Sequence, residues 1–197
     1  MDLIKIKDIY DSPNYNSQII VAGWVRAFRG NRFIELNDGS TIENIQCVIS
    51  DSNRKNEDYK KINVGSSVKI KGNLIESIGK GQSFEVEILN LEILGESDPE
   101  KYPIQPKKHS FEFLREQAHL RIRTSTFSAV MRIRSKLAYG VHKFFNERGF
   151  NYIHTPIITS SDAEGVGEMF QVTTLNSTQA NKKNFDNTDD FFGKKTS

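Results

Sequence analysis

An aromatic ring, an amide and two guanidinium groups lie close together in the first half of the chain. Ile34 and Leu36 alternate with Phe33, and Ile45 and Cys47 flank Gln46, so Phe33 and Gln46 are both expected on the outer face of a sheet. Arg26 and Arg29 lie just upstream. A ring that stacks a base, an amide that reads its edge and arginines that hold phosphate make a platform for single-stranded nucleic acid. The alternative is a ring packed under a loop beside a solvated amide.

A second candidate is the segment from Glu164 to Glu168, which encloses Gly165-Val166-Gly167. It has neither the third glycine nor the following Lys-Ser/Thr of a phosphate-binding loop. The segment is therefore predicted to be a turn carrying two carboxylates. A carboxylate in such a turn either binds an ammonium group or is simply solvated.

Metal and thiol chemistry are not expected. The single cysteine, Cys47, excludes an internal disulfide and any zinc site built on paired cysteines, and its apolar surroundings predict a buried structural thiol. The histidines have no metal-ligand spacing, and no catalytic residue is assigned within the chain. They are His109, His119, His142 and His154.

The composition is that of an ordinary globular protein. The chain has 197 residues, of which 37% are hydrophobic and 26% charged, and its net charge is +2. No apolar run reaches the ~20 residues of a membrane helix, and the acidic start lacks the basic region of a secretory signal, so a cytoplasmic location without membrane contact is expected. Residues 101–148 carry 11 Lys/Arg and 3 Asp/Glu, a net of +8. That stretch either meets a polyanion such as RNA or forms a solvated helix face.

The elements that must position these residues begin with five short strands separated by turn residues. A charged segment, Asp51–Lys61, with room for a short helix, separates the third from the fourth. The expected strands are Ile19–Phe28, Arg32–Leu36, Thr41–Ile49, Ser67–Ser77 and Ser83–Leu94. This order of elements is typical of an OB-fold β-barrel, although other small barrels share the strand count.

The second half of the chain is expected to be a connector and then a mixed α/β region. Prolines in residues 95–123 argue against regular structure in its first part. Apolar residues at three- and four-residue spacing predict a helix from about Ser125 to Glu147, ended by Gly149. Asn151–Thr159 is expected to be a strand interrupted by Pro156, and the polar residues 176–190 a loop.

Residues 147–158, Glu-Arg-Gly-Phe-Asn-Tyr-Ile-His-Thr-Pro-Ile-Ile, resemble motif 1 of the class II aminoacyl-tRNA synthetases. An OB barrel ahead of that motif is similar to the subgroup for aspartate, asparagine and lysine. Within the subgroup, the resemblance is greatest to the asparaginyl-tRNA synthetases. It rests on residues 79–82, 118–121, 161–172 and 191–194.

The resemblance implies roles for individual residues. It implies that Phe33 and Gln46 stack and read the central anticodon uridine, and that Arg26, with Arg29, lies near the anticodon backbone. Glu85 matches a position near the first anticodon base. Glu164 matches the glutamate that receives the ammonium group of the amino acid, and a carboxylate there orients the substrate by charge. Pro156 and the helix before it match the homodimer interface.

The implied fold is α+β: a five-stranded OB barrel (residues 1–97), a hinge (98–123) and the start of an antiparallel class II catalytic domain (124–197). The implied parent enzyme is an ATP- and Mg²⁺-dependent ligase that activates asparagine and transfers it to tRNA-Asn. The motifs that hold ATP would follow Ser197, so the 197-residue chain is expected to bind an anticodon but neither ATP nor Mg²⁺, and to be inactive alone.

Two alternatives stay open. The first is an aspartyl-tRNA synthetase of the same subgroup, against which the loop at residues 161–172 argues. The second is a non-catalytic RNA-binding protein that uses the barrel alone. A Phe-Arg-x-Glu motif downstream of Ser197 would favour a synthetase, and a stop codon there would favour the binding protein.

Overall fold

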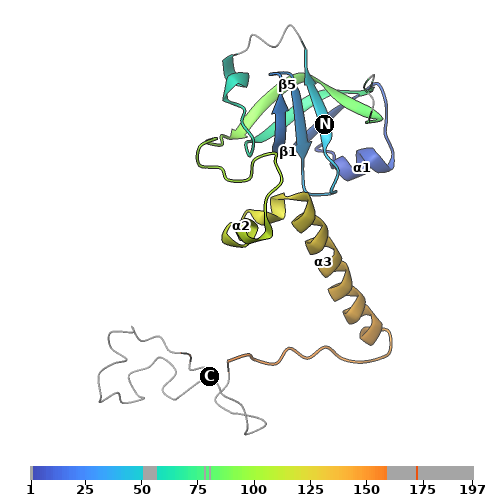
Figure 1. Ribbon diagram of the computed structural model, residues 1–197. Coiled ribbons are helices and arrows are strands. Elements are labelled where there is room, and N and C mark those ends of the chain that lie inside the picture. Colours follow the sequence, from blue (N-terminus) through green and yellow to red (C-terminus); the bar gives the residue numbers. More distant parts are fainter. Residues whose placement is uncertain (1, 51–56, 78, 80, 159–171, 173–197) are drawn as a thin grey trace, which may run out of the picture. The chain divides into compact units, whose positions relative to one another are not determined.

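The structure is a computed structural model and describes residues 2–50, 57–77, 79, 81–158 and 172. The described chain contains a β-barrel followed by helices (Figure 1). The strands of the barrel are β1 (Ser17–Arg29), β2 (Phe33–Asn37), β3 (Ile45–Ile49), β4 (Ser67–Glu76) and β5 (Phe84–Gly95). The chain divides into two units, Met1–Ala138 and Tyr139–Ser197, and the barrel lies wholly within the first.

The five strands close into a barrel in the order β1-β2-β3-β5-β4. All neighbours pair antiparallel except β3 and β5, which are parallel and complete the closure. β1 is long enough to serve two partners: Ser17 to Trp24 pair with β4, and Trp24 to Arg29 pair with β2. The OB-type barrel expected from the order of elements is therefore confirmed.

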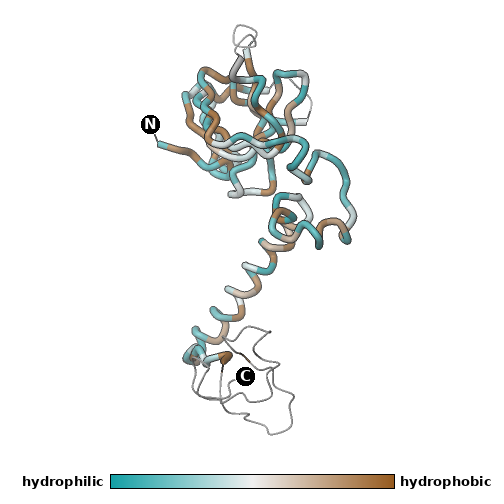
Figure 2. Tube along the Cα trace, turned by 90° about the vertical axis from the view of Figure 1, so that its left-hand side faces the viewer, coloured by the Kyte–Doolittle hydropathy of each residue, from teal (hydrophilic) through white to brown (hydrophobic). Residues whose placement is uncertain are grey.

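Alternation of side chains fills the barrel. Ile34 and Leu36 of β2, and Ile45, Cys47 and Ile49 of β3, are fully buried, as their spacing predicts. Burial raises the pKa of the Cys47 thiol far above its ordinary value, because a thiolate is poorly solvated in an apolar core. Figure 2 shows the resulting alternation of hydrophobic and hydrophilic residues along the strands.

Two short helices also contribute to the core. α1 (Ile6–Asp11) buries Ile6 and Ile9 against the barrel, and the backbone N–H of Ile6 donates to Asp38 Oδ2 at 2.8 Å. The 3₁₀ helix η2 (Glu57–Lys61) lies between β3 and β4 in the sequence, and its Tyr59 side chain is buried. The sequence predicted a short helix in the segment that forms η2 but none in the segment that forms α1.

Helices follow the barrel. α2 (Phe111–Glu116) is capped at its N-terminus by Ser110, whose side chain accepts a hydrogen bond from the Phe113 backbone N–H. The 3₁₀ helix η3 (Arg121–Arg123) leads directly into α3 (Ser125–Asn146), which confirms the long helix expected there. Figure 2 shows hydrophobic and hydrophilic residues recurring along α3, as in an amphipathic helix.

Two sequence-based expectations are wrong. Residues 151–158 form no strand; a strand needs a partner to pair its backbone groups, and these residues have no strand or bridge assignment. The third strand begins at Ile45 rather than Thr41. Asn37, at the end of β2, holds the loop between β2 and β3 out of the sheet, because its Nδ2 donates to the carbonyl oxygens of Thr41 (3.2 Å) and Glu43 (2.9 Å).

Candidate nucleic-acid interface

The register of β2 and β3 brings the predicted platform residues onto one outer surface. Phe33 pairs with Val48, and Glu35 pairs directly with Gln46. Antiparallel partners share a face, so Gln46 lies diagonally across from Phe33 on the outside of the barrel. Phe33 is 37% exposed and Gln46 is half-buried, which confirms the outward orientation predicted for both.

A β-bulge places Arg29 on the same surface. Strict alternation would put Arg26 and Arg29, three residues apart, on opposite faces of β1. The register shifts between Val25 and Ala27, so that Arg29 becomes the cross-strand partner of Phe33. The Arg29 guanidinium then reaches Glu35, with Nη2 2.6 Å from Oε1. Arg29 therefore enters this surface as half of an ion pair.

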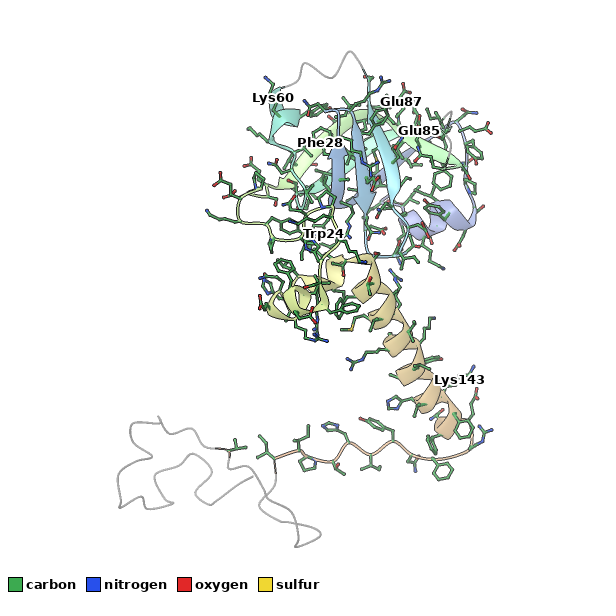
Figure 3. The ribbon with its side chains drawn as sticks, viewed as in Figure 1. Trp24, Phe28, Lys60, Glu85, Glu87 and Lys143 are labelled. Atoms are coloured by element: carbon green, nitrogen blue, oxygen red, sulfur yellow. The ribbon has the colours of Figure 1, made fainter. Side chains whose placement is uncertain are left out.

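On β5, at the edge of this surface next to Gln46, one carboxylate oxygen of Glu85 accepts hydrogen bonds from three polar side chains. Oε2 accepts hydrogen bonds from Gln46 Nε2 (3.1 Å), Gln82 Nε2 (3.1 Å) and Ser77 Oγ (3.3 Å). A carboxylate only accepts, so the Gln46 amide must turn its NH₂ group toward Glu85 and its carbonyl oxygen away. Figure 3 shows Glu85 and Glu87 side by side on β5. We call Phe33, Arg29, Gln46 and Glu85 the outer-face cluster.

The Phe33 ring also has a cation against it. The guanidinium carbon of Arg32 lies 5.4 Å from the ring centroid, a cation–π arrangement. Positive charge beside a half-exposed ring suits a nucleotide, because the base stacks on the ring and its phosphate meets the guanidinium. The cluster thus has the chemistry of a single-strand nucleic-acid surface.

Arg26 lies apart from the outer-face cluster. It lines a cavity together with Trp24, and Figure 3 shows Trp24 at the end of the barrel from which the chain continues into the helices. Burial lowers the pKa of the Arg26 guanidinium; among the nearby charges, Arg123 lowers it further and Glu35 opposes the shift. Arginine remains protonated despite such shifts. The structure therefore separates the two arginines that the sequence grouped.

The remaining predicted site residues, Pro156 and Glu164, are not part of the outer-face cluster. Pro156 is exposed in a segment without regular structure. Glu164 lies outside the described residues, as do residues 161–171 and 191–194, on which part of the family resemblance rests. The role assigned to each of these residues stays a prediction.

Two features are absent from the described residues. Among them, no group of three or more His, Cys, Asp or Glu side chains could hold a metal ion. No helix in the described ranges combines the length and apolar character needed to cross a membrane.

Sequence reasoning missed the residues that organise the surface. Glu35 follows Phe33 by two positions, so alternation alone places it on the same face, and its negative charge beside Arg29 was a usable signal. Gln82 and Ser77 carry no such signal, because they reach Glu85 from the turn between β4 and β5.

Two family models match the chain. Residues 19–94 match an OB-fold nucleic acid binding domain, and residues 110–186 match the class II tRNA synthetases for D, K and N. The chain belongs to the class II tRNA synthetases of the D, K and N group. The OB-fold barrel that carries the outer-face cluster is thus the part of this synthetase chain that matches the OB-fold nucleic acid binding domain.

Individual relatives agree with this assignment. The chain is 50% identical over 196 residues to an asparagine–tRNA ligase of Borreliella burgdorferi, covering 96% of this chain and 42% of the relative. It is 52% identical over 204 residues to an asparagine–tRNA ligase of Cytophaga hutchinsonii, covering 100% of this chain and 44% of the relative. The synthetase chain therefore spans well under half the length of these curated relatives.

A solved structure shares the fold. The crystal structure of asparaginyl-tRNA synthetase from Pyrococcus horikoshii complexed with asparaginyl-adenylate matches with a TM-score of 0.72 and 23% identity. The match covers 87% of this chain and 40% of that one. At this identity the likeness supports the architecture of the synthetase chain and no more.

Proposed function

We propose that this synthetase chain is part of an asparagine–tRNA ligase. The observation that carries the proposal is identity of about 50% to asparagine–tRNA ligases over nearly the whole chain. In this proposal residues 1–97 bind the anticodon, 98–123 form a hinge, and 124–197 open the catalytic domain. The whole enzyme activates asparagine with ATP and Mg²⁺ and transfers it to tRNA-Asn in the cytoplasm, where these substrates occur together.

The outer-face cluster binds the anticodon loop. Phe33 stacks one base, and Gln46, with its amide turned by Glu85, meets the edge of that base. Arg29, held by Glu35, contributes positive charge beside the ring. Glu85 lies on the same surface, close enough for a neighbouring nucleotide to reach it.

Two further roles belong to the whole enzyme. Glu164 receives the ammonium group of asparagine, as a carboxylate suits that charge. α3 and Pro156 contribute to a homodimer interface. The exposed apolar side chains of α3 support this, because a helix face of this kind needs a covering partner. They include Ile133 (59% exposed) and Leu137 (64%).

Binding of tRNA by this chain tests the anticodon assignment. A tRNA-Asn transcript is compared with a transcript in which the central anticodon uridine is replaced by cytidine. We expect the change to weaken binding by about 5- to 150-fold, the equivalent of ~1–3 kcal/mol for a misread base. Equal affinity for both transcripts would contradict base reading by the outer-face cluster.

The choice of amino acid has its own test in the whole enzyme. We expect charging of tRNA-Asn with asparagine and not of tRNA-Asp with aspartate. Charging with aspartate alone would favour the aspartyl alternative.

A further inference from the structure

A cavity of about 620 Å³ lies within the Met1–Ala138 unit, and no residue of the outer-face cluster lines it. One wall comes from β1, β2 and the loop after β2, and includes Trp24, Asn37 and Asn44. The other comes from η3 and the first turns of α3, and includes Thr124 and Ser128. Residues almost a hundred positions apart therefore meet around one space.

The cavity is strongly basic. Four cationic side chains line it: Arg26, Arg123, Arg132 and Lys136. We call these four residues and the space between them the basic pocket. No described lining residue is an aspartate or glutamate; the nearby carboxylate of Glu35, which accepts from Asn44 Nδ2 (3.4 Å) and acts on Arg26, is already paired with Arg29. One shared carboxylate does not balance four cations, and like charges gathered in this way are stabilised when an anion joins them.

The polar atoms of the basic pocket are incompletely satisfied. Arg123 Nη1 and Arg132 Nε are buried and have no hydrogen-bond partner among the described residues. A buried guanidinium N–H without an acceptor costs free energy, because it has lost water without replacement. Phosphate oxygens are suitable acceptors for such groups, since guanidinium pairs with phosphate through parallel N–H···O bonds.

The basic pocket is held in shape by contacts that leave it open. Arg132 donates from Nη1 to the Ser40 carbonyl oxygen at 3.1 Å and from Nη2 to the Gly39 carbonyl oxygen, which fixes α3 to the loop after β2. The Arg123 guanidinium carbon lies 4.3 Å from the Trp24 ring centroid. Stacking on Trp24 fixes the orientation of the Arg123 guanidinium group, so the N–H groups at its edge are already positioned before a ligand binds.

We propose that the basic pocket binds a phosphate group. Two sources share that chemistry: a phosphodiester of a bound RNA strand and a free phosphorylated small molecule. The RNA source rests on the proposed function, because it adds a backbone contact made by residues other than the outer-face cluster. The small-molecule source does not depend on it.

The test uses the full 197-residue chain and two substitutions in the basic pocket. Lys136→Gln removes an exposed charge at its edge, and Arg26→Gln removes one from its wall. Arg134→Gln is the matched control, since Arg134 is exposed on α3 two residues from Lys136 and does not line the cavity. Circular dichroism and thermal unfolding check that each variant is folded; Lys136→Gln keeps the test decisive if Arg26→Gln does not fold.

Two titrations separate the sources. The first measures tRNA transcript binding at several salt concentrations. The second measures binding of inorganic phosphate and of adenosine 5′-monophosphate by calorimetry. For the RNA source we expect each pocket variant to weaken tRNA binding about 3- to 10-fold and to lower the salt slope by about 1, with Arg134→Gln unchanged. For the small-molecule source we expect heat of binding that both pocket variants reduce and the control retains.

The proposal is overturned if tRNA binding and both phosphate titrations are the same for wild type, Lys136→Gln and Arg134→Gln. An equal loss in Arg134→Gln and Lys136→Gln would also overturn it, because a diffuse charge effect needs no pocket. Failure of the proposed function looks different: the central anticodon substitution then has no effect, whether or not the pocket variants do.

Discussion

Replacement of Phe33 by alanine is the sharpest test of the outer-face cluster. The guanidinium of Arg32 lies over the ring, so at most one face of the ring accepts a base and one stacking contact is at stake. A base stacked on an aromatic side chain contributes about 1–3 kcal/mol. We therefore expect the Kd for a tRNA-Asn transcript to rise by about 5- to 150-fold, measured by filter binding or fluorescence anisotropy at one fixed salt concentration.

The same substitution should leave the fold intact. Phe33 is 37% exposed, so its removal costs less than the ~3–5 kcal/mol of a fully buried phenylalanine. We expect a decrease of about 1–2 kcal/mol in the free energy of unfolding, measured by urea denaturation. Phe33→Tyr keeps the ring and should bind within about twofold of wild type. Phe111→Ala removes a ring that is 54% exposed on α2 and should not change tRNA affinity.

Two results would refute the stacking argument. One is a folded Phe33→Ala protein whose Kd lies within twofold of wild type. The other is an equal loss for Phe111→Ala, since that would show a general apolar effect rather than a stacked base.

Three further predictions concern the barrel. Glu85→Ala removes the acceptor that turns the Gln46 amide, so discrimination between uridine and cytidine at the central anticodon position should fall about fivefold, the equivalent of ~1 kcal/mol; unchanged discrimination would contradict the positioning. Gly72→Ala should lower the free energy of unfolding by about 1–3 kcal/mol in urea, because its Cβ would clash with the Glu87 carbonyl oxygen and with Val86 Cγ1 (2.6 Å), whereas Gly79→Ala, whose Cβ would meet Ser77 Oγ at an ordinary 3.5 Å, should change little. Folding keeps the Cys47 thiol protonated, so the native state binds the proton that the unfolded state loses above the ordinary pKa of 9.0; stability should fall by about 1.4 kcal/mol between pH 8 and 10, and a Cys47→Ala protein should lack that part of the decrease.

The parts of the fold that follow from local alternation were predictable. Ile34 and Leu36 occupy one face of β2, and period-two spacing is enough to place them inward and Phe33 outward. The same reasoning oriented Gln46 on β3. α3 was predictable because its apolar spacing extends over six turns, which is enough for periodicity to be read with little ambiguity.

The parts that depend on distant contacts were not predictable. The bulge between Val25 and Ala27 exists only in relation to β2, so nothing in β1 alone indicates that Arg29 will face outward. α1 has only two buried residues and no capping side chain, so it is too short to show a period. The basic pocket could not be predicted from the sequence either, because it is formed by β1 and α3, which are about a hundred residues apart.

The double pairing of β1 also has a consequence for synthesis of the protein on the ribosome. Apart from a single bridge between Ile20 and Leu3, the first half of β1 pairs with β4, with Trp24 opposite Ser67 and Ser17 opposite Leu74, some 40–60 residues later. At about 5–20 residues per second, that half-strand emerges several seconds before its partner is made. During this interval the nascent chain presents an open edge to neighbouring nascent chains. Conditions that slow translation between residues 24 and 67 should therefore lower the yield of folded protein more than an equal delay after residue 95.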